Sequence, residues 1–97
     1  MNSTNKNFIE KSCNYFGKQQ TLTVCMEECA ELIQCVSKEL RGQEARNHME
    51  EEIGDVLIGI SDLIYICDLD EKRIQRWIDF KQNRQIGRIA ANEVKEE

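Results

Sequence analysis

Residues 18–41 read KQQTLTVCMEECAELIQCVSKELR, and their apolar side chains recur every three or four positions. At about 100° per residue, this period places the apolar side chains on one side of a helix. The stripe consists of Leu22, Cys25, Cys29, Leu32, Ile33, Val36 and Leu40. Gly42 follows it, and Lys38 and Arg41 lie in the last turn, where cations suit the helix dipole. The stretch predicts a long amphipathic helix.

The helical period continues through most of the 97 residues, without a strand pattern, an internal repeat or a low-complexity linker. The absence of proline and the small number of glycines also favour helices over strands. We expect one all-α domain, with an N-terminal helix in 1–17, two antiparallel motif helices in 18–67, a basic helix over 70–91 and a frayed tail over 92–97. A chain of this length buries a modest core, so we expect a four-helix bundle that associates with further copies.

Two pairs of acidic residues lie at helical spacing beside the apolar stripes. Glu28 and Glu31 belong to the first motif helix, and Glu52 and Asp55 to the second. Residues three apart share a helix face, so two antiparallel helices can bring all four carboxylates to one ion. A charged group on an apolar flank is costly unless it is paired or coordinated. The pattern predicts a Mg²⁺ site for phosphate chemistry, with Mn²⁺ as a substitute.

Charge is unevenly distributed along the chain. Residues 27–55 hold nine acids and three bases, a net charge of −6, whereas residues 72–88 hold six bases and one acid, a net charge of +5. This division indicates either ion pairs between helices or a cleft with metal ligands on one side and phosphate-binding cations on the other. The net charge of −5 argues against nucleic acid as a partner. Trp77, on the basic helix, is expected to lie on a packing or dimer face.

Five cysteines lie inside the expected helices, mostly at apolar positions, which indicates reduced, buried thiols. Zinc bound by Cys25 and Cys29 is the less favoured interpretation, because such a site needs more ligands. The only histidine, His48, lies far along the chain and is expected to be exposed at the start of a helix. The apolar runs are short and the N-terminus shows no signal pattern, so we expect a cytoplasmic protein without a membrane partner.

The two acidic motifs resemble those of a known family. Glu27-Glu28-Cys29-Ala30-Glu31-Leu32-Ile33 followed by Glu51-Glu52-Ile53-Gly54-Asp55-Val56 resembles the EExxE and ExxD motifs of MazG-like all-α nucleoside triphosphate pyrophosphatases. Phe16-Gly17-Lys18 is similar to the aromatic-glycine lead into the family's motif helix, and Lys81-Gln82-Asn83-Arg84 to its K-x-N-R element. The resemblance extends from Tyr15 to Arg88.

The resemblance implies an enzyme, a nucleoside triphosphate pyrophosphohydrolase acting on acid anhydrides. Its substrates would be nucleoside or deoxynucleoside triphosphates, hydrolysed with Mg²⁺ between the α and β phosphates to the monophosphate and pyrophosphate. The implied metal ligands are Glu28, Glu31, Glu52 and Asp55. The implied substrate contacts are Lys81, Arg84 and Lys38 for the phosphates, Asn83 for the base or sugar, and Gln20 for the base pocket.

Three questions remain open at the level of sequence. The base that activates water is either Glu27 or a metal-ligating residue such as Glu28. The substrate range is either broad or restricted to one base, as in a dUTP or dCTP hydrolase. A non-catalytic helical module that binds nucleotide or a protein partner is the alternative from another class. In either class we expect a homodimer or a homotetramer.

Overall fold

The structure is a computed structural model that describes residues 4–96, and the side chains of residues 4–93. It contains four helices, α1 (Lys6–Phe16), α2 (Lys18–Leu40), α3 (Arg46–Ile66) and α4 (Glu71–Glu96). Over residues 4–96 it has no strand. The expected all-α class is confirmed.

Local capping explains where the first helices begin and end. The side chain of Asn5 accepts a hydrogen bond of 3.0 Å from the backbone N–H of Phe8 and so caps the start of α1. Gly17 ends α1 with a φ of +85°, and its N–H donates to the carbonyl of Cys13 at 2.9 Å. A positive φ is accessible to glycine at little cost. The chain can therefore turn at one residue and begin α2 directly at Lys18.

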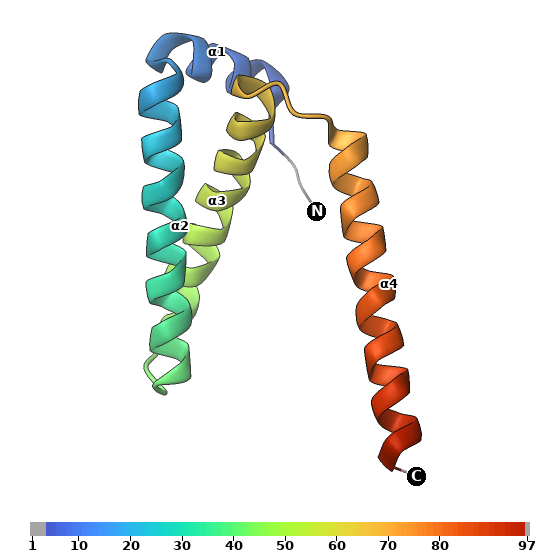
Figure 1. Cartoon of the computed structure of the whole chain (residues 1–97). Coiled ribbons are helices and arrows are strands. Elements are labelled where there is room, and N and C mark those ends of the chain that lie inside the picture. The colour runs from blue at the N-terminus through green and yellow to red at the C-terminus, as the bar shows by residue number, and fades with distance from the viewer. Residues whose placement is uncertain (1–3, 97) are drawn as a thin grey trace.

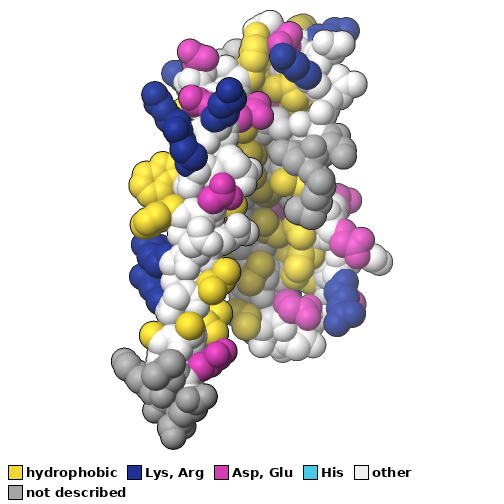
Figure 2. Space-filling view, turned by 90° about the vertical axis from the view of Figure 1, so that its right-hand side faces the viewer, with side chains coloured by type: hydrophobic (Ala, Val, Ile, Leu, Met, Phe, Trp, Pro, Cys, Tyr) yellow, Lys and Arg dark blue, Asp and Glu magenta, His cyan; other side chains and the backbone are white. Residues whose placement is uncertain are grey.

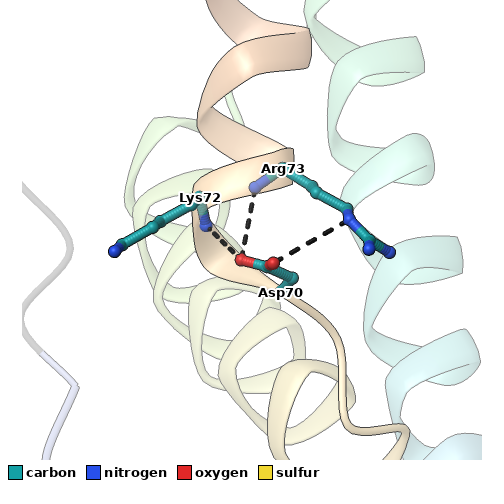
Figure 3. Close-up of polar contacts among 3 residues, drawn as sticks. All are labelled: Asp70, Lys72 and Arg73. Atoms are coloured by element: carbon teal, nitrogen blue, oxygen red, sulfur yellow. Dashed lines mark hydrogen bonds and ion pairs between the residues drawn. The ribbon is translucent and has the colours of Figure 1, made fainter.

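Asp70 caps the start of α4, as its sequence position suggests. Its Oδ1 accepts hydrogen bonds from the backbone N–H groups of Lys72 at 2.8 Å and Arg73 at 3.4 Å (Figure 3). Its Oδ2 lies 3.8 Å from Nε of Arg73. The carboxylate thus satisfies free N–H groups of the first turn and complements the positive end of the helix dipole.

The end of α4 differs from the expectation. The sequence predicted a helix over 70–91 and a frayed tail over 92–97, but α4 continues to Glu96. No glycine or proline follows Gly87, and Ala90, Ala91 and Glu93 all favour helix. The intrinsic preference of these residues accounts for the extra turn.

The first three helices pack together, with α2 and α3 side by side and α1 across one end (Figure 1). Apart from Glu52, the buried side chains are small or of medium size: Ile9, Cys13, Thr21, Cys25 and Cys35 within these helices, and Ala45 directly before α3. The backbones of α2 and α3 approach closely where Gly59 faces Cys25, since a Cβ on Gly59 would lie 3.1 Å from the Cys25 sulfur. Small residues on both helices therefore set the distance between them.

Helix α4 projects away from the other three helices (Figure 1). Of its described side chains only Ile74 is even half-buried, and apolar side chains are exposed on the face shown in Figure 2 beside several Lys and Arg side chains. The radius of gyration is 17.2 Å, whereas a compact domain of this length has about 13 Å. The four-helix bundle expected from the sequence is thus not closed within one chain.

No helix of the described part is long and apolar enough to span a membrane.

Candidate metal centre

Three carboxylates meet between α2 and α3. Glu28, Glu52 and Asp55 each offer an oxygen, and these oxygens all lie within 4.8 Å of one another. Glu52 is only 2% exposed, and Glu28 and Asp55 are half-buried. Oε2 of Glu28 and Oε2 of Glu52 are buried without a hydrogen-bond partner among the described residues. Buried carboxylate oxygens need a donor or a cation, so the group is suited to hold a divalent metal ion.

The packing of α2 against α3 explains why these acids meet. Glu28 follows Cys25 by three residues, and Asp55 precedes Gly59 by four. Each acid therefore lies one turn from this close contact between the two helices, on the same helix face. Glu52 adds a further turn on α3. The small pair Cys25 and Gly59 positions the carboxylates against one another.

Burial and mutual repulsion raise the pKa values of the central acids. Burial, followed by the neighbouring carboxylates of Glu52 and Asp55, raises the pKa of Glu28 to about 7. Burial is also the main cause that raises the pKa of Glu52, and Glu31 adds to it. Within the described side chains, no Lys or Arg forms an ion pair with these carboxylates. A bound cation would favour their charged forms.

A second group shares Glu52 with the first. One ligand atom each from Glu31, His48 and Glu52 lie within 4.8 Å of one another, and Nε2 of His48 lies 3.2 Å from Oε1 of Glu52. His48 was predicted from the sequence to be an exposed residue at the start of a helix. Its side chain is indeed 52% exposed, but it also reaches the acidic group. Its position four residues before Glu52 was the signal that sequence reasoning missed.

A hollow of about 110 Å³ opens beside the first group. It is lined by Glu28 and Asp55 together with Val24, Cys25, Ile58, Gly59 and Asp62. Asp62 lies two turns after Asp55 on α3, and its carboxylate accepts a hydrogen bond of 3.4 Å from the Cys13 thiol. Burial raises the pKa of Asp62. Asp62 was not among the residues predicted from the sequence, although its spacing from Asp55 places both on one helix face.

The remaining candidate residues lie outside these groups. Glu27 is exposed on α2, and Gln20, also exposed, precedes Glu28 by eight residues, which is about 12 Å along the helix. Lys38 is half-buried and follows Glu31 by seven residues, about 10 Å.

Three further candidates, Lys81, Asn83 and Arg84, are exposed on α4, and the guanidinium of Arg84 lies 5.7 Å from the centre of the Phe80 ring. Because α4 projects away from α2 and α3 (Figure 1), the structure does not bring these three to the carboxylates of the same chain.

The fold and the site define an all-α domain with a group of carboxylates, suited to hold a metal ion, between two adjacent helices. The family model of the MazG nucleotide pyrophosphohydrolase domain matches residues 16–83. The chain therefore belongs to this family, which confirms the resemblance seen in its motifs and indicates pyrophosphohydrolase activity in general. The match includes all four motif acids, Lys81 and Asn83. Neither the curated proteins nor the solved structures gave a match to the chain.

The raised pKa of Glu28 predicts how the metal-free protein responds to pH. Between its ordinary pKa of 4.5 and about 7, the folded state binds more protons than the unfolded state. The stability of the metal-free protein should therefore fall as the pH rises through this window. Thermal melts in a chelator should give a higher Tm at about pH 5.5 than at about pH 8, and Glu28→Gln should flatten this dependence. A Tm that rises with pH in both proteins would contradict the expectation.

Proposed function

We propose that the protein hydrolyses nucleoside or deoxynucleoside triphosphates between the α and β phosphates, with Mg²⁺, to the monophosphate and pyrophosphate. The pair of buried carboxylate oxygens without partners, on Glu28 and Glu52, is the observation that carries the metal dependence. The family supports the choice of a pyrophosphohydrolase reaction. Acids from two packed helices form a rigid ligand set, as such chemistry requires.

The residues present fit a Mg²⁺ ion. Glu28, Glu52 and Asp55 would hold it, and Glu31, on the same α2 face as Glu28, would contribute a fourth carboxylate. When bound, Mg²⁺ supplies positive charge that stabilises the phosphates as pyrophosphate departs. No glycine-rich phosphate-binding loop occurs in the sequence, so side chains must provide the other phosphate contacts.

We assign the role of general base to Glu28 in preference to Glu27. Oε2 of Glu28 is buried beside the acidic group without a hydrogen-bond partner among the described residues, so it is available to accept a proton from a water held there. Glu27 is exposed and belongs to neither acidic group. Glu27→Gln is therefore the matched control for Glu28→Gln, since both variants lose one charge from adjacent positions of α2.

The substrate contacts of α4 require an assembly of copies. Lys81 and Arg84 would bind the phosphate chain and Asn83 the base or sugar, while Lys38 and Gln20 would contribute from α2. Since α4 projects away from its own acidic group, we propose that the antiparallel bundle closes between copies in a homodimer or homotetramer. The basic α4 complements the acidic segment 27–55, and its exposed apolar side chains fit a buried interface.

The proposed assembly predicts the effect of a charge on the apolar face of α4. Trp77 is 62% exposed, and Phe80, which packs edge-on against it, is 55% exposed. Light scattering should give at least twice the mass of one chain for the wild type. Trp77→Glu should weaken association by about 30-fold or more, because buried aromatic anchors often contribute 2 kcal/mol or more. Gln85→Glu, an exposed polar position on α4, is the control. A monomeric wild type would refute the assembly.

A panel of nucleoside and deoxynucleoside triphosphates, assayed for pyrophosphate release with Mg²⁺, tests the proposed function. Release from several substrates would support a broad pyrophosphohydrolase, and release from dUTP or dCTP alone would identify a base-specific enzyme. No release from any substrate, together with no Mg²⁺-dependent rise in Tm, would favour the non-catalytic module.

The five cysteines carry free thiols, which fits the cytoplasmic location that we also propose.

A further inference from the structure

Beside the Mg²⁺ ligands lies a group of different chemistry. We propose that Glu31, His48 and Glu52 form a second cation site, which takes a transition-metal dication such as Co²⁺, Mn²⁺ or Zn²⁺ in preference to Mg²⁺. The site shares Glu52 with the first group, includes Glu31, which is also the proposed fourth Mg²⁺ carboxylate, and adds a ligand from outside the acidic motifs. It does not depend on turnover of any nucleotide.

The distances fit ligands of one ion. The three ligand atoms lie within 4.8 Å of one another, and His48 Nε2 is 3.2 Å from Glu52 Oε1. Ligand atoms about 2.1 Å from a metal are about 3.0 Å apart at a right angle and about 3.4 Å apart in a tetrahedron. The observed separation of the nitrogen and the oxygen falls in this range. Glu31 is exposed, so its side chain is free to close the remaining distance.

The two oxygens of Glu52 allow it to serve both groups. The side chain of Glu52 is only 3% exposed, and its Oε1 is the atom near His48. Its Oε2 is buried without a hydrogen-bond partner among the described residues. The imidazole thus satisfies one of the two oxygens at most. A carboxylate with one oxygen toward each group can bind two cations, one on each side.

The donor atoms give the two sites different preferences. Glu28, Glu52 and Asp55 offer only oxygens, which suit Mg²⁺. The imidazole nitrogen of His48 is a ligand that zinc and other transition metals bind well and Mg²⁺ seldom accepts. The alternative is that His48 serves only as a hydrogen-bond partner that holds Glu52 in place. That role predicts no direct bond between a metal and the ring.

The first test uses the single histidine as a reporter. Because the chain has one histidine, the ring signals of His48 are unique in the NMR spectrum of the untagged full chain. Zn²⁺ should shift the ring ¹⁵N signal of Nε2 strongly, and Mg²⁺ at saturating concentration should not. Ring signals that respond to neither ion, or equally to both, would overturn the proposal.

The second test counts Co²⁺ sites by calorimetry. The wild type should bind one Co²⁺ more per chain than His48→Asn, or bind that ion at least about 100-fold more tightly. A histidine that only hydrogen-bonds to a metal ligand would change the metal affinity by about 10- to 100-fold, so the expected loss lies beyond that range. Asp55→Asn should keep the histidine-dependent Co²⁺, and Asn47→Ala, an exposed neighbour of His48, should match the wild type. Any Co²⁺ bound by the cysteines persists in all four proteins, so the difference reports the histidine.

The outcomes separate this proposal from the proposed function. His48 is exposed, so His48→Asn should keep the helices, which circular dichroism checks. Equal Co²⁺ binding by the wild type and His48→Asn, with pyrophosphate release intact, would refute the second site alone. A histidine-dependent Co²⁺ site in a protein that releases no pyrophosphate would support the second site and refute the hydrolase.

Discussion

Asp55→Asn is expected to lower pyrophosphate release by at least about 100-fold while the helices stay folded. The substitution removes a charged oxygen ligand from the group formed with Glu28 and Glu52, and it leaves the size of the side chain unchanged. Asp55 is half-buried, and the groups beside its carboxylate are the like-charged acids Glu28 and Glu52, so its charge does not hold the helices together. The loss should therefore appear in turnover and in Mg²⁺ affinity, and not in the circular dichroism spectrum.

The matched control is Glu51→Gln. Glu51 lies on the same helix, carries the same charge and is exposed outside both acidic groups. Its substitution should leave activity within about twofold of the wild type, because exposed charges contribute little. Glu31→Gln should resemble Asp55→Asn. Wild-type activity in Asp55→Asn or Glu31→Gln would reject the carboxylate group as the catalytic metal site.

The part of the fold that the sequence predicted depends on local rules. The helical period predicted the long helices, but not the buried set of α2, since four residues of its predicted apolar stripe are exposed in the single chain: Cys29, Ile33, Val36 and Leu40. Gly17 and Asp70 lie at helix ends because of their backbone and capping preferences. The meeting of Glu28, Glu52 and Asp55 was predictable for the same reason. Residues three apart share a face, and a short loop joins the two helices.

The features that the sequence did not predict depend on packing between elements. Helical period alone does not determine whether α4 folds back on its own chain, because an apolar stripe fits an interface between copies equally well. Gly59 was not singled out, since its effect comes from the close approach of Cys25 on another helix. His48 and Asp62 were not predicted because their roles depend on contacts with residues on other turns or helices. His48 contacts Glu52 one turn later, and Asp62 accepts a hydrogen bond from Cys13 on α1.

Glu52→Gln should have opposite effects on stability and on function. In the metal-free protein at about pH 8, the variant should be more stable than the wild type. Burial and Glu31 raise the pKa of Glu52, so ionisation of Glu52 is less favourable in the folded state than in the unfolded state. The free energy of unfolding of the wild type therefore falls as the pH rises above the ordinary pKa of a glutamate. Glutamine has the same shape, carries no charge and can donate a hydrogen bond to a neighbouring carboxylate.

The same substitution removes the residue common to both cation groups. The rise in Tm that Mg²⁺ gives the wild type should disappear in Glu52→Gln, and pyrophosphate release should fall by about 100-fold or more. Glu50→Gln, an exposed neighbour, should change neither property. Melts with Mg²⁺ and with a chelator, at about pH 5.5 and pH 8, separate the effects. A less stable metal-free variant at about pH 8 would show that the contact with His48 outweighs the burial of charge. The expected result would instead mean that the fold accepts a destabilising carboxylate because a cation stabilises it in the working protein.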